Sequence, residues 1–294
     1  MELTLSSFAK INLLLHIVNK RKDGYHNLQT IFQTIDFHDR LTFRFRKSKT
    51  FHLVLDVADS RIPADNANLV YKACHAFHQM YPIERRIEVT FDKQIPVESG
   101  LGGGSSNAAV TLIALSHHFN WPLTRTELQA IARRIGADVS FFLYGGTALA
   151  SNRGDRIHPL ADADSREVLL VHPEVRCSTK VIYDKYDEMQ LLTPRRNFIK
   201  IHLDRRPESL KDLDSRIEND LEQVVFTLYP ELDSIKSRLL DAGAVAAALS
   251  GSGSTVFGLF KSADDLEKAA RRFPNAIRSR FLTRTEYRKT LKLE

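Results

Sequence analysis

Apolar and polar residues alternate along much of the first hundred positions, the pattern of strands that bury one face. Residues 2–18 form the first such segment. Leu41–Phe45, Phe51–Val57 and Arg86–Phe91 show the same alternation over shorter lengths. We therefore expect the N-terminal part of the chain to be rich in β-structure.

Helical periodicity appears between these strands. Apolar residues recur at intervals of three and four after Asn66, which we expect to cap a helix that Pro82 ends. A second helix is predicted to run from Asn107 to just before Trp121. Both helices carry an apolar face and should cover the sheet.

A capping-box pattern marks the start of a third helix. Thr124 is followed three residues later by Glu127, and Gly136 should end the helix. Asp138 is thereby placed just beyond a helix end. The apolar stretch Phe141–Ala150 is expected to be a loop that enters a strand.

The second half of the chain has a different order of elements. It predicts a strand over Glu167–Val171, a short helix from Ser178, a helix over Leu232–Leu240, strands over Ala244–Leu249 and Thr255–Phe260, a helix capped by Ser262, and a strand over Ile277–Leu282. Helix, strand, strand, helix, strand is the order of a split, ferredoxin-like sandwich. Because residues 154–164 are polar, we expect one domain over residues 1–158 and another over residues 159–294.

The bulk composition agrees with a globular protein of two domains. Its 294 residues exceed what one hydrophobic core usually organises, and 43% of them are apolar. The longest apolar runs fall well short of the roughly 20 residues that a membrane span needs. The first 20 residues lack the pattern of a secretory signal. We expect a cytoplasmic protein with no membrane partner.

Charge and cysteine content narrow the possible ligands. Cys74 and Cys177 lie far apart and outside any CxxC or Cys/His cluster, so neither a disulfide nor a zinc site is indicated. The net charge of +6 suits an anionic ligand, either nucleotide phosphate or a nucleic-acid backbone. Basic residues are scattered and are typical of solvated surface.

The glycine-rich segment at residues 100–104 carries the clearest chemical signal. Glycines between a strand and a helix expose backbone N–H groups, and the helix start adds partial positive charge, so the segment suits phosphate binding, although a flexible turn is an equal alternative for such a segment taken alone. No lysine follows as in a P-loop. Ser105 stands where the third glycine of a dinucleotide-binding motif would be.

The full segment instead resembles the ATP-binding signature of the GHMP kinases. It reads Pro96-x-x-x-Gly100-Leu101-Gly102-Gly103-Gly104-Ser105-Ser106. Further motifs in the family's order are Ala9-Lys10-Ile11-Asn12-Leu13, Asp23-Gly24-Tyr25-His26, Gly136-Ala137-Asp138-Val139, Asn219-Asp220-Leu221-Glu222 and Leu249-Ser250-Gly251-Ser252-Gly253. The two N-terminal motifs are similar to those of the branch that phosphorylates a cytidine diphosphate derivative of methylerythritol.

This resemblance implies a fold and a reaction. The fold would be a two-lobed α/β (α+β) structure, with a ribosomal S5 domain 2-like N-terminal lobe and a ferredoxin-like C-terminal lobe. The reaction would transfer the γ-phosphate of ATP, with Mg²⁺, to a small-molecule hydroxyl in a site between the lobes. Its product would belong to non-mevalonate isoprenoid biosynthesis.

The resemblance also assigns roles to residues. Asp138 would be the catalytic base, although an aspartate after a helix-ending glycine is often a cap or turn residue. Lys10 would lie beside it and keep it ionised, although a lysine can equally sit at a strand edge facing water. Asn12, on the same strand face, would hold the substrate or orient this pair.

Ligand contacts are implied in the same way. Tyr25, His26 and Tyr183, the last following Ser178-Thr179, would clamp and read the cytosine, although each could be a packing or turn residue. Asn68 and Lys93 would lie near the adenine or ribose of ATP. The spacing of acidic residues marks no magnesium ligand, and the hydroxyl of Ser106 is the candidate that the glycine segment offers.

Two other functions remain open at this point. A GHMP kinase for another small alcohol would keep the glycine segment without a cytidine clamp. A basic RNA-binding module would fit the positive charge, but the chain lacks a basic stripe with interleaved aromatic residues. We expect a monomer or homodimer that acts on a small molecule and binds no nucleic acid.

Overall fold

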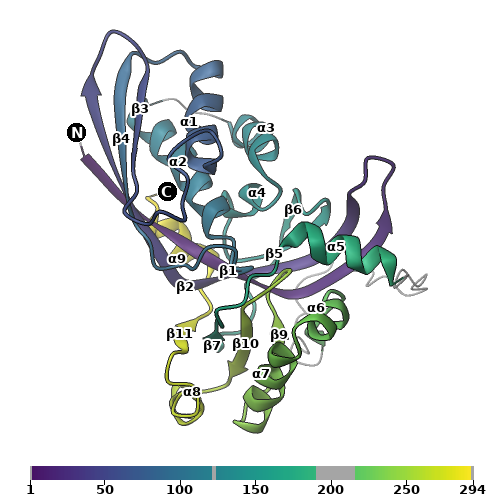
Figure 1. The fold of residues 1–294 in the computed structure, drawn as a ribbon. Coiled ribbons are helices and arrows are strands. Elements are labelled where there is room, and N and C mark those ends of the chain that lie inside the picture. Colours follow the sequence, from purple (N-terminus) through teal and green to yellow (C-terminus); the bar gives the residue numbers. More distant parts are fainter. Residues whose placement is uncertain (1, 121–123, 190–215, 293–294) are drawn as a thin grey trace.

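The computed structural model describes residues 2–120, 124–189 and 216–292 (Figure 1). Two β-sheets pack face to face, and each carries helices on its outer side. The first sheet belongs mainly to the N-terminal half of the chain and the second to the C-terminal half. The order of the layers is therefore helices, sheet, sheet, helices.

The first sheet is built around two long antiparallel strands, β1 (Glu2–Lys20) and β2 (His26–Lys47). Its other strands are β3 (His52–Asp56), β4 (Arg85–Asp92), β5 (Thr147–Asn152), β6 (Arg156–Pro159) and β8 (Glu218–Asn219). The main order is β3-β4-β2-β1-β8, while β5 pairs with β2 and β6 pairs with β5. Strand β1 thus runs along the centre of the molecule.

Four helices cover the outer face of the first sheet (Figure 1). They are α1 (Leu69–Met80), α2 (Gly103–His118), α3 (Arg125–Ile135) and α4 (Val139–Phe142). Apolar side chains from these helices and from alternate strand positions form one core, which includes the fully buried Phe43, Phe77 and Leu112. Burial of this apolar face holds the helices on the sheet.

The second sheet has the order β11-β7-β10-β9 and is antiparallel throughout. Its strands are β7 (Glu167–Val171), β9 (Ala246–Leu249), β10 (Val256–Phe260) and β11 (Ile277–Arg280), and its outer helices are α7 (Pro230–Asp241) and α8 (Ala263–Ala270). Strand, helix, strand, strand, helix, strand with this order is a ferredoxin-like arrangement. The expected architecture of the second half is confirmed.

A shared core joins the two sheets. Ile11, Leu13 and Ile35 of the first sheet pack with Leu170 and Phe257 of the second, and all are fully or almost fully buried. The remaining helices α5 (Thr179–Glu188), α6 (Glu222–Leu228) and α9 (Arg284–Thr290) lie along this junction or beyond it. Because α9 packs back on the first core, the domain boundary after residue 158 stays a prediction.

Several element boundaries differ from those predicted. The cap of α1 is Asn68 rather than Asn66, since the Asn68 side chain accepts a hydrogen bond from the Val70 amide. Helix α2 begins at Gly103, four residues before the predicted Asn107, because Gly102 adopts a left-handed conformation with φ 73° and turns the chain into the helix. The pattern also did not predict α4, α6, α9, β6 or β8.

The predicted start and end of α3 are confirmed. Thr124 and Glu127 form the predicted capping box of α3, which ends at Ile135 before Gly136. Both cysteines, Cys74 and Cys177, are free and buried. Within the described residues, no helix has the length and apolar character needed to cross a membrane.

Candidate active site

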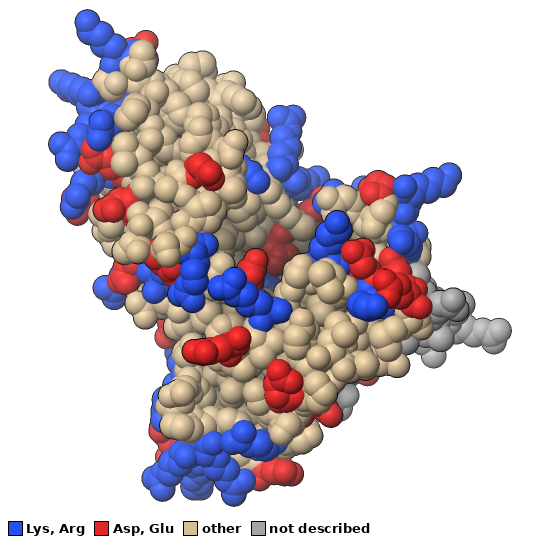
Figure 2. Space-filling model, viewed as in Figure 1, with Lys and Arg blue, Asp and Glu red and all other residues tan. Residues whose placement is uncertain are grey.

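Two adjoining cavities open on the face where the lobes meet, and Figure 2 shows this face hollowed near its centre. One has a volume of about 410 Å³ and the other about 470 Å³. We call them the acceptor cavity and the donor cavity. Glu98, Gly100, Gly102 and Thr179 line both. The glycine segment therefore forms a wall between two compartments.

Backbone geometry explains why this wall is built from glycine. Gly100 and Gly102 have φ angles of 78° and 73°, a region that side chains disfavour. A Cβ on Gly100 would also overlap the carbonyl oxygen of Ser250. The amide of Lys10 on β1 donates to the Leu101 carbonyl at 3.0 Å, so the segment is fixed to the central strand.

The start of α2 supplies the anion-binding part of the donor cavity. Gly103, Gly104 and Ser105 lie in the first turn of this 16-residue helix and line the cavity. The first amides of a helix have no intrahelical acceptor, and the helix dipole adds partial positive charge there. This end of the cavity can therefore hold phosphate groups.

Asn68, Lys93 and Pro96 also line the donor cavity, as expected for an ATP site. Asn68 also caps α1, because its side chain accepts a hydrogen bond from the Val70 amide. Lys93 forms an ion pair with the fully buried Asp39, whose Oδ1 accepts from the backbone amides of Gln94 and Ile95. This pairing holds the lysine beneath the glycine segment.

Two residues of the glycine motif face away from both cavities. Leu101 is fully buried in the core between the sheets. Ser106 is also fully buried, and its Oγ accepts a hydrogen bond from Ser7 at 2.8 Å. This placement gives no support to Ser106 as a magnesium ligand.

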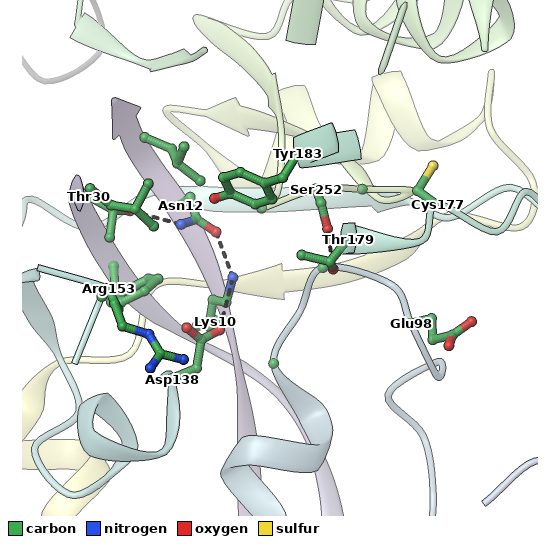
Figure 3. Close-up of a pocket in the computed structure, with 18 of the residues that line it drawn as sticks. Lys10, Asn12, Thr30, Glu98, Asp138, Arg153, Cys177, Thr179, Tyr183 and Ser252 are labelled. Atoms are coloured by element: carbon green, nitrogen blue, oxygen red, sulfur yellow. Dashed lines mark hydrogen bonds and ion pairs between the residues drawn. The ribbon is translucent and has the colours of Figure 1, made fainter. Parts of the chain in front are cut away.

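Lys10, Asn12 and Asp138 meet in the acceptor cavity (Figure 3). The Lys10 ammonium donates to Oδ1 of Asn12 at 2.6 Å and lies 3.7 Å from Oδ2 of Asp138. The amide of Asn12 donates in turn to the Thr30 hydroxyl at 2.8 Å. These contacts bring the three predicted residues together and orient the lysine toward the carboxylate.

Burial sets the electrostatics of this cluster. The Lys10 residue is 3% exposed, and this loss of solvation lowers the pKa of its ammonium below the ordinary value. The negative charge of Asp138 acts in the opposite direction and offsets part of that effect. An ammonium in such surroundings is strongly attracted to any further anion that enters the cavity.

Asp138 lies in the short connection between α3 and α4, and α4 was not predicted from the sequence. Gly136 ends α3, and Asp138 is the residue that precedes α4. Its carbonyl accepts from the Phe141 amide at 3.1 Å, while its side chain makes no capping bond. The carboxylate is one third exposed and free to face a ligand.

An aromatic side chain of helix α5 lies beside Asn12 in the acceptor cavity (Figure 3). Tyr183 of α5 lines the cavity, and its ring stacks on His26 with centroids 5.1 Å apart. Nε2 of His26 lies 2.8 Å from Oδ1 of Asp187. Burial raises the pKa of the Tyr183 hydroxyl, with a smaller contribution from Asp138, so the ring stays neutral.

Tyr25 lies at the rim rather than in the cavity wall. It is 54% exposed, and the Arg153 guanidinium lies 3.6 Å from the centroid of its ring. Tyr25 and His26 are absent from the cavity lining among the described residues, but each contacts a residue that belongs to it. Of the predicted cytidine-binding residues, Tyr183 therefore lines the cavity, His26 is buried against the Tyr183 ring, and Tyr25 is exposed at the rim.

The sequence pattern missed several side chains of the acceptor cavity. Arg153, Lys180, Thr30 and Ser252 all line it. Arg153 directly precedes the polar stretch 154–164 that was interpreted as a domain boundary, and Lys180 lies in a predicted helix start. Thr179, which was predicted, bonds to Ser252 through their hydroxyls at 2.8 Å. With Lys10, the two additional cations make the cavity suited to an anionic ligand.

Cys177 also lines the acceptor cavity, but it is not an activated nucleophile. Burial, with a smaller contribution from Glu231, raises the pKa of its thiol to about 11. A thiol with this pKa is almost fully protonated at neutral pH. The cavity therefore contains no sign of covalent chemistry at this residue.

Among the described residues, no group of three His, Cys, Asp or Glu side chains is arranged to hold a metal ion. A magnesium ion that is held mainly by substrate phosphates needs one or two protein carboxylates. Glu98 has a suitable carboxylate, since it lines both cavities at the glycine wall. The site fits a metal that arrives with phosphate better than one held in a protein cage.

Comparison with known proteins adds independent evidence. Two family models match: the N-terminal domain of GHMP kinases over residues 68–146 and the C-terminal domain of GHMP kinases over residues 198–278. A 4-diphosphocytidyl-2-C-methyl-D-erythritol kinase from Caldanaerobacter subterraneus subsp. tengcongensis is 36% identical over 92% of each chain. One from Thermodesulfovibrio yellowstonii is 40% identical over 92% of this chain and 94% of its own length.

Solved structures agree with these matches. A crystal structure of 4-(cytidine 5'-diphospho)-2C-methyl-D-erythritol kinase superposes with a TM-score of 0.78 and 30% identity, covering 95% of this chain and 99% of the other. A homoserine kinase from Cytophaga hutchinsonii superposes with a TM-score of 0.71 at 20% identity, covering 95% and 93% of the two chains. The second likeness supports the fold alone.

Proposed function

The chain belongs to the GHMP kinases, in the family of 4-diphosphocytidyl-2-C-methyl-D-erythritol kinases, and we propose how its two cavities carry out that family's reaction. The reaction is the transfer of the γ-phosphate of ATP to the 2-hydroxyl of 4-diphosphocytidyl-2-C-methyl-D-erythritol. Its products are ADP and the 2-phosphate, in non-mevalonate isoprenoid biosynthesis. In this assignment ATP occupies the donor cavity and the alcohol occupies the acceptor cavity.

One observation carries this assignment: the glycine wall separates the start of α2 from the Lys10–Asp138 pair. Phosphoryl transfer depends mainly on holding donor and acceptor in line and on neutralising phosphate charge. The α2 amides would hold the donor phosphates. The γ-phosphate would extend past Gly102 toward Lys10.

The acceptor hydroxyl would lie against Asp138. As its oxygen forms a bond to the γ-phosphorus, its proton passes to a carboxylate oxygen of Asp138, and the bond from the γ-phosphorus to the oxygen of ADP breaks. Lys10 stabilises the ionised carboxylate and the negative charge that gathers on the transferred phosphoryl group. Asn12 keeps the ammonium in place during this step.

The nucleoside part of the acceptor would bind against Tyr183 in the acceptor cavity. Tyr183 offers a ring face for stacking, the buried His26 would support that ring, and Tyr25 would complete the clamp from the rim. Arg153 and Lys180 would pair with the acceptor diphosphate. Thr179 would donate or accept a hydrogen bond beside them. An uncharged alcohol would offer these cations no phosphate to bind.

Magnesium would enter with ATP and reduce the charge of the phosphates. Glu98 is the residue that we propose as its carboxylate ligand, because it lines both cavities beside the glycine wall. We further propose that the protein acts in the cytoplasm, as a monomer or homodimer, on a small molecule rather than on nucleic acid.

A panel of acceptors with labelled ATP tests the proposal. We expect label transfer to the cytidine diphosphate derivative of methylerythritol, and little transfer to mevalonate, homoserine or free methylerythritol. Efficient phosphorylation of an acceptor without a cytidine group would refute the proposed acceptor site. Tight, salt-sensitive binding of RNA without ATP turnover would instead favour the nucleic-acid alternative.

A further inference from the structure

The motif Asn219-Asp220-Leu221-Glu222 contributes no side chain to either cavity, yet Asn219 is 6% exposed and fully hydrogen-bonded. Its amide nitrogen donates to the carbonyl oxygens of Leu249 and Gly251, each at 2.8 Å. Its Oδ1 accepts from the Leu221 amide at 2.9 Å. With these bonds made, Asn219 has no N–H group left to offer a substrate.

The neighbouring acidic residues attach the same segment to other strands. Oδ2 of Asp220 accepts from the Ile17 amide of β1 at 2.8 Å. Oε1 of Glu222 accepts from the Leu249 amide at 2.8 Å. The short strand β8 therefore connects the central strand of the first sheet to the end of β9 in the second.

The turn held by Asn219 comprises residues 250–253 and lies against the proposed reacting groups. A Cβ built on Gly251 would lie 3.4 Å from Nζ of Lys10 and 3.6 Å from Oδ1 of Asn12. The Ser250 hydroxyl donates to the Gly100 carbonyl at 2.9 Å. Ser252 bonds to Thr179. This turn thus touches the lysine pair, the glycine wall and the start of α5.

We propose that Asn219 is a positioning residue for phosphoryl transfer, which fixes the 250–253 turn against Lys10 and the glycine wall. This inference rests on the proposed kinase function. The Leu249 and Gly251 carbonyls that the Asn219 amide nitrogen binds are both acceptors, so holding them needs two N–H donors on a short side chain. Asparagine provides this combination, whereas aspartate of the same shape has no donor when ionised.

The Gly251 carbonyl explains why loss of the hydrogen bonds from Asn219 should slow phosphoryl transfer. Lys10 has three N–H donors and bonds to Asn12 while facing Asp138. If Asn219 no longer held the Gly251 carbonyl, that oxygen could rotate toward the nearby ammonium and compete for it. The lysine would then be drawn away from the carboxylate and from the transferred phosphoryl group.

The variant Asn219→Asp tests this role, because it keeps the size and the Leu221 bond but replaces the donor with an acceptor. We expect kcat to fall about 10- to 100-fold, the cost of a small misplacement of reacting groups, while the KM for ATP changes by less than about threefold. A loss of affinity for both substrates with an unchanged kcat would overturn the inference.

Leu239→Ala is the matched control for lost stability. Leu239 is fully buried in the core between α7 and the second sheet and lines neither cavity. Both variants should unfold at lower denaturant than the parent, but Leu239→Ala should keep the parent kcat at a temperature where it stays folded. An equal fall of kcat in both variants would reduce Asn219 to a purely structural role and overturn the inference.

The parent protein separates this inference from the function on which it rests. Absence of phosphoryl transfer by the parent would overturn the proposed function and the inference together. An active parent with an equally active, folded Asn219→Asp variant would overturn the inference alone.

Discussion

Nζ of Lys10 lies 3.7 Å from Oδ2 of Asp138, and the two side chains differ greatly in exposure: 4% for the lysine and 33% for the aspartate. The lysine is thus enclosed by protein, whereas the carboxylate keeps one side open to the acceptor cavity. A buried cation beside an accessible carboxylate suits a base that must stay ionised until a substrate hydroxyl arrives. The first two predictions follow from this pair.

Replacing Asp138 by asparagine should remove the proton acceptor while keeping the shape of the side chain. We expect kcat to fall about 100- to 10,000-fold, the range that positioned acid–base groups contribute. Because the variant also removes the anionic partner of the buried Lys10 ammonium, the unfolding midpoint should fall as well. Steady-state kinetics and urea unfolding measure the two effects, and a variant with near-normal kcat would refute the role of Asp138 as the base.

The dependence of activity on pH should reflect the titration of the Lys10 ammonium. Burial lowers the pKa of this group below its ordinary value of 10.5, and Asp138 offsets part of the shift. Activity should therefore fall as pH rises through that lowered pKa, before ordinary lysines titrate. Since the folded pKa is the lower one, the unfolded chain binds more protons between the two values, and stability should rise with pH there.

The Asp138→Asn variant provides a second measurement of the same group. Loss of the nearby negative charge should lower the pKa of Lys10 further, which nuclear magnetic resonance of the isotope-labelled lysine can follow. An unchanged titration would show that the two charges do not interact.

The variant Gly104→Ala tests phosphate binding at the start of α2 without destabilising the fold. A Cβ at this position meets nothing nearer than Leu69 Cδ1 at 3.7 Å, and alanine favours a helix by about 0.5–1 kcal/mol over glycine. Stability should stay the same or rise. If the donor phosphates approach the α2 backbone, the added methyl should raise the KM for ATP about tenfold or more. The KM for the acceptor serves as the internal control.

Tyr183 offers a test of the proposed cytosine stack. Tyr183→Leu should raise the KM for the acceptor about 5- to 150-fold, since stacking of one base on an aromatic ring contributes about 1–3 kcal/mol. Tyr183→Phe keeps the ring and should bind the acceptor almost as well as the parent. Equal losses in both variants would assign the effect to the hydroxyl rather than to stacking.

The capping box of α9 should contribute to the free energy of unfolding in a way that depends on pH. Hydrogen bonds from the Thr283 side chain and backbone, assisted by Arg280, lower the pKa of Glu286 from 4.5 to about 2. The stabilisation is present above pH 4.5 and is lost as pH falls toward about 2. Thr283→Ala should cost about 0.5–2 kcal/mol at neutral pH and weaken this dependence. Urea unfolding at several pH values measures both, with Thr290→Ala as a control on the same helix.

Much of the fold could be predicted because local patterns and tertiary packing agree. Strand β4 and the ferredoxin-like order of the second half were clear from alternation and periodicity. Strand β2 was predicted only over Leu41–Phe45, although it spans His26–Lys47. Its polar residue Gln33 is untypical of a buried strand position, yet it is buried and pairs with Ile11 of β1 on one side and Thr147 of β5 on the other.

The start of α2 shows another limit of sequence reasoning. Glycine has a low intrinsic preference for helix, so the pattern placed the helix start after the last glycine. In the structure, Gly103 and Gly104 already belong to α2, because the left-handed Gly102 directs the chain and packing on Ile95 fixes it. Tertiary contacts outweigh propensity here.

The chemistry of the site was predictable where motifs are short, and less so where distant segments meet. Lys10 and Asn12 share a strand face, so their contact follows from the two-residue period. Arg153 and Lys180 carry no comparable signal, because their place in the cavity depends on how the lobes pack. The role of Asn219 needed the carbonyls that it binds to be located first.

The wall of glycines between the two cavities also bears on inhibitor design. Because both compartments border the same few residues, one compound with an adenosine end, a polyphosphate chain and a cytidine end would occupy them together. Once the first end is bound, the second is held at an effective concentration in the millimolar range, given a linker of suitable length. Such a bisubstrate ligand would gain affinity from avidity, and the optimum linker length would measure the span from one base-binding end to the other.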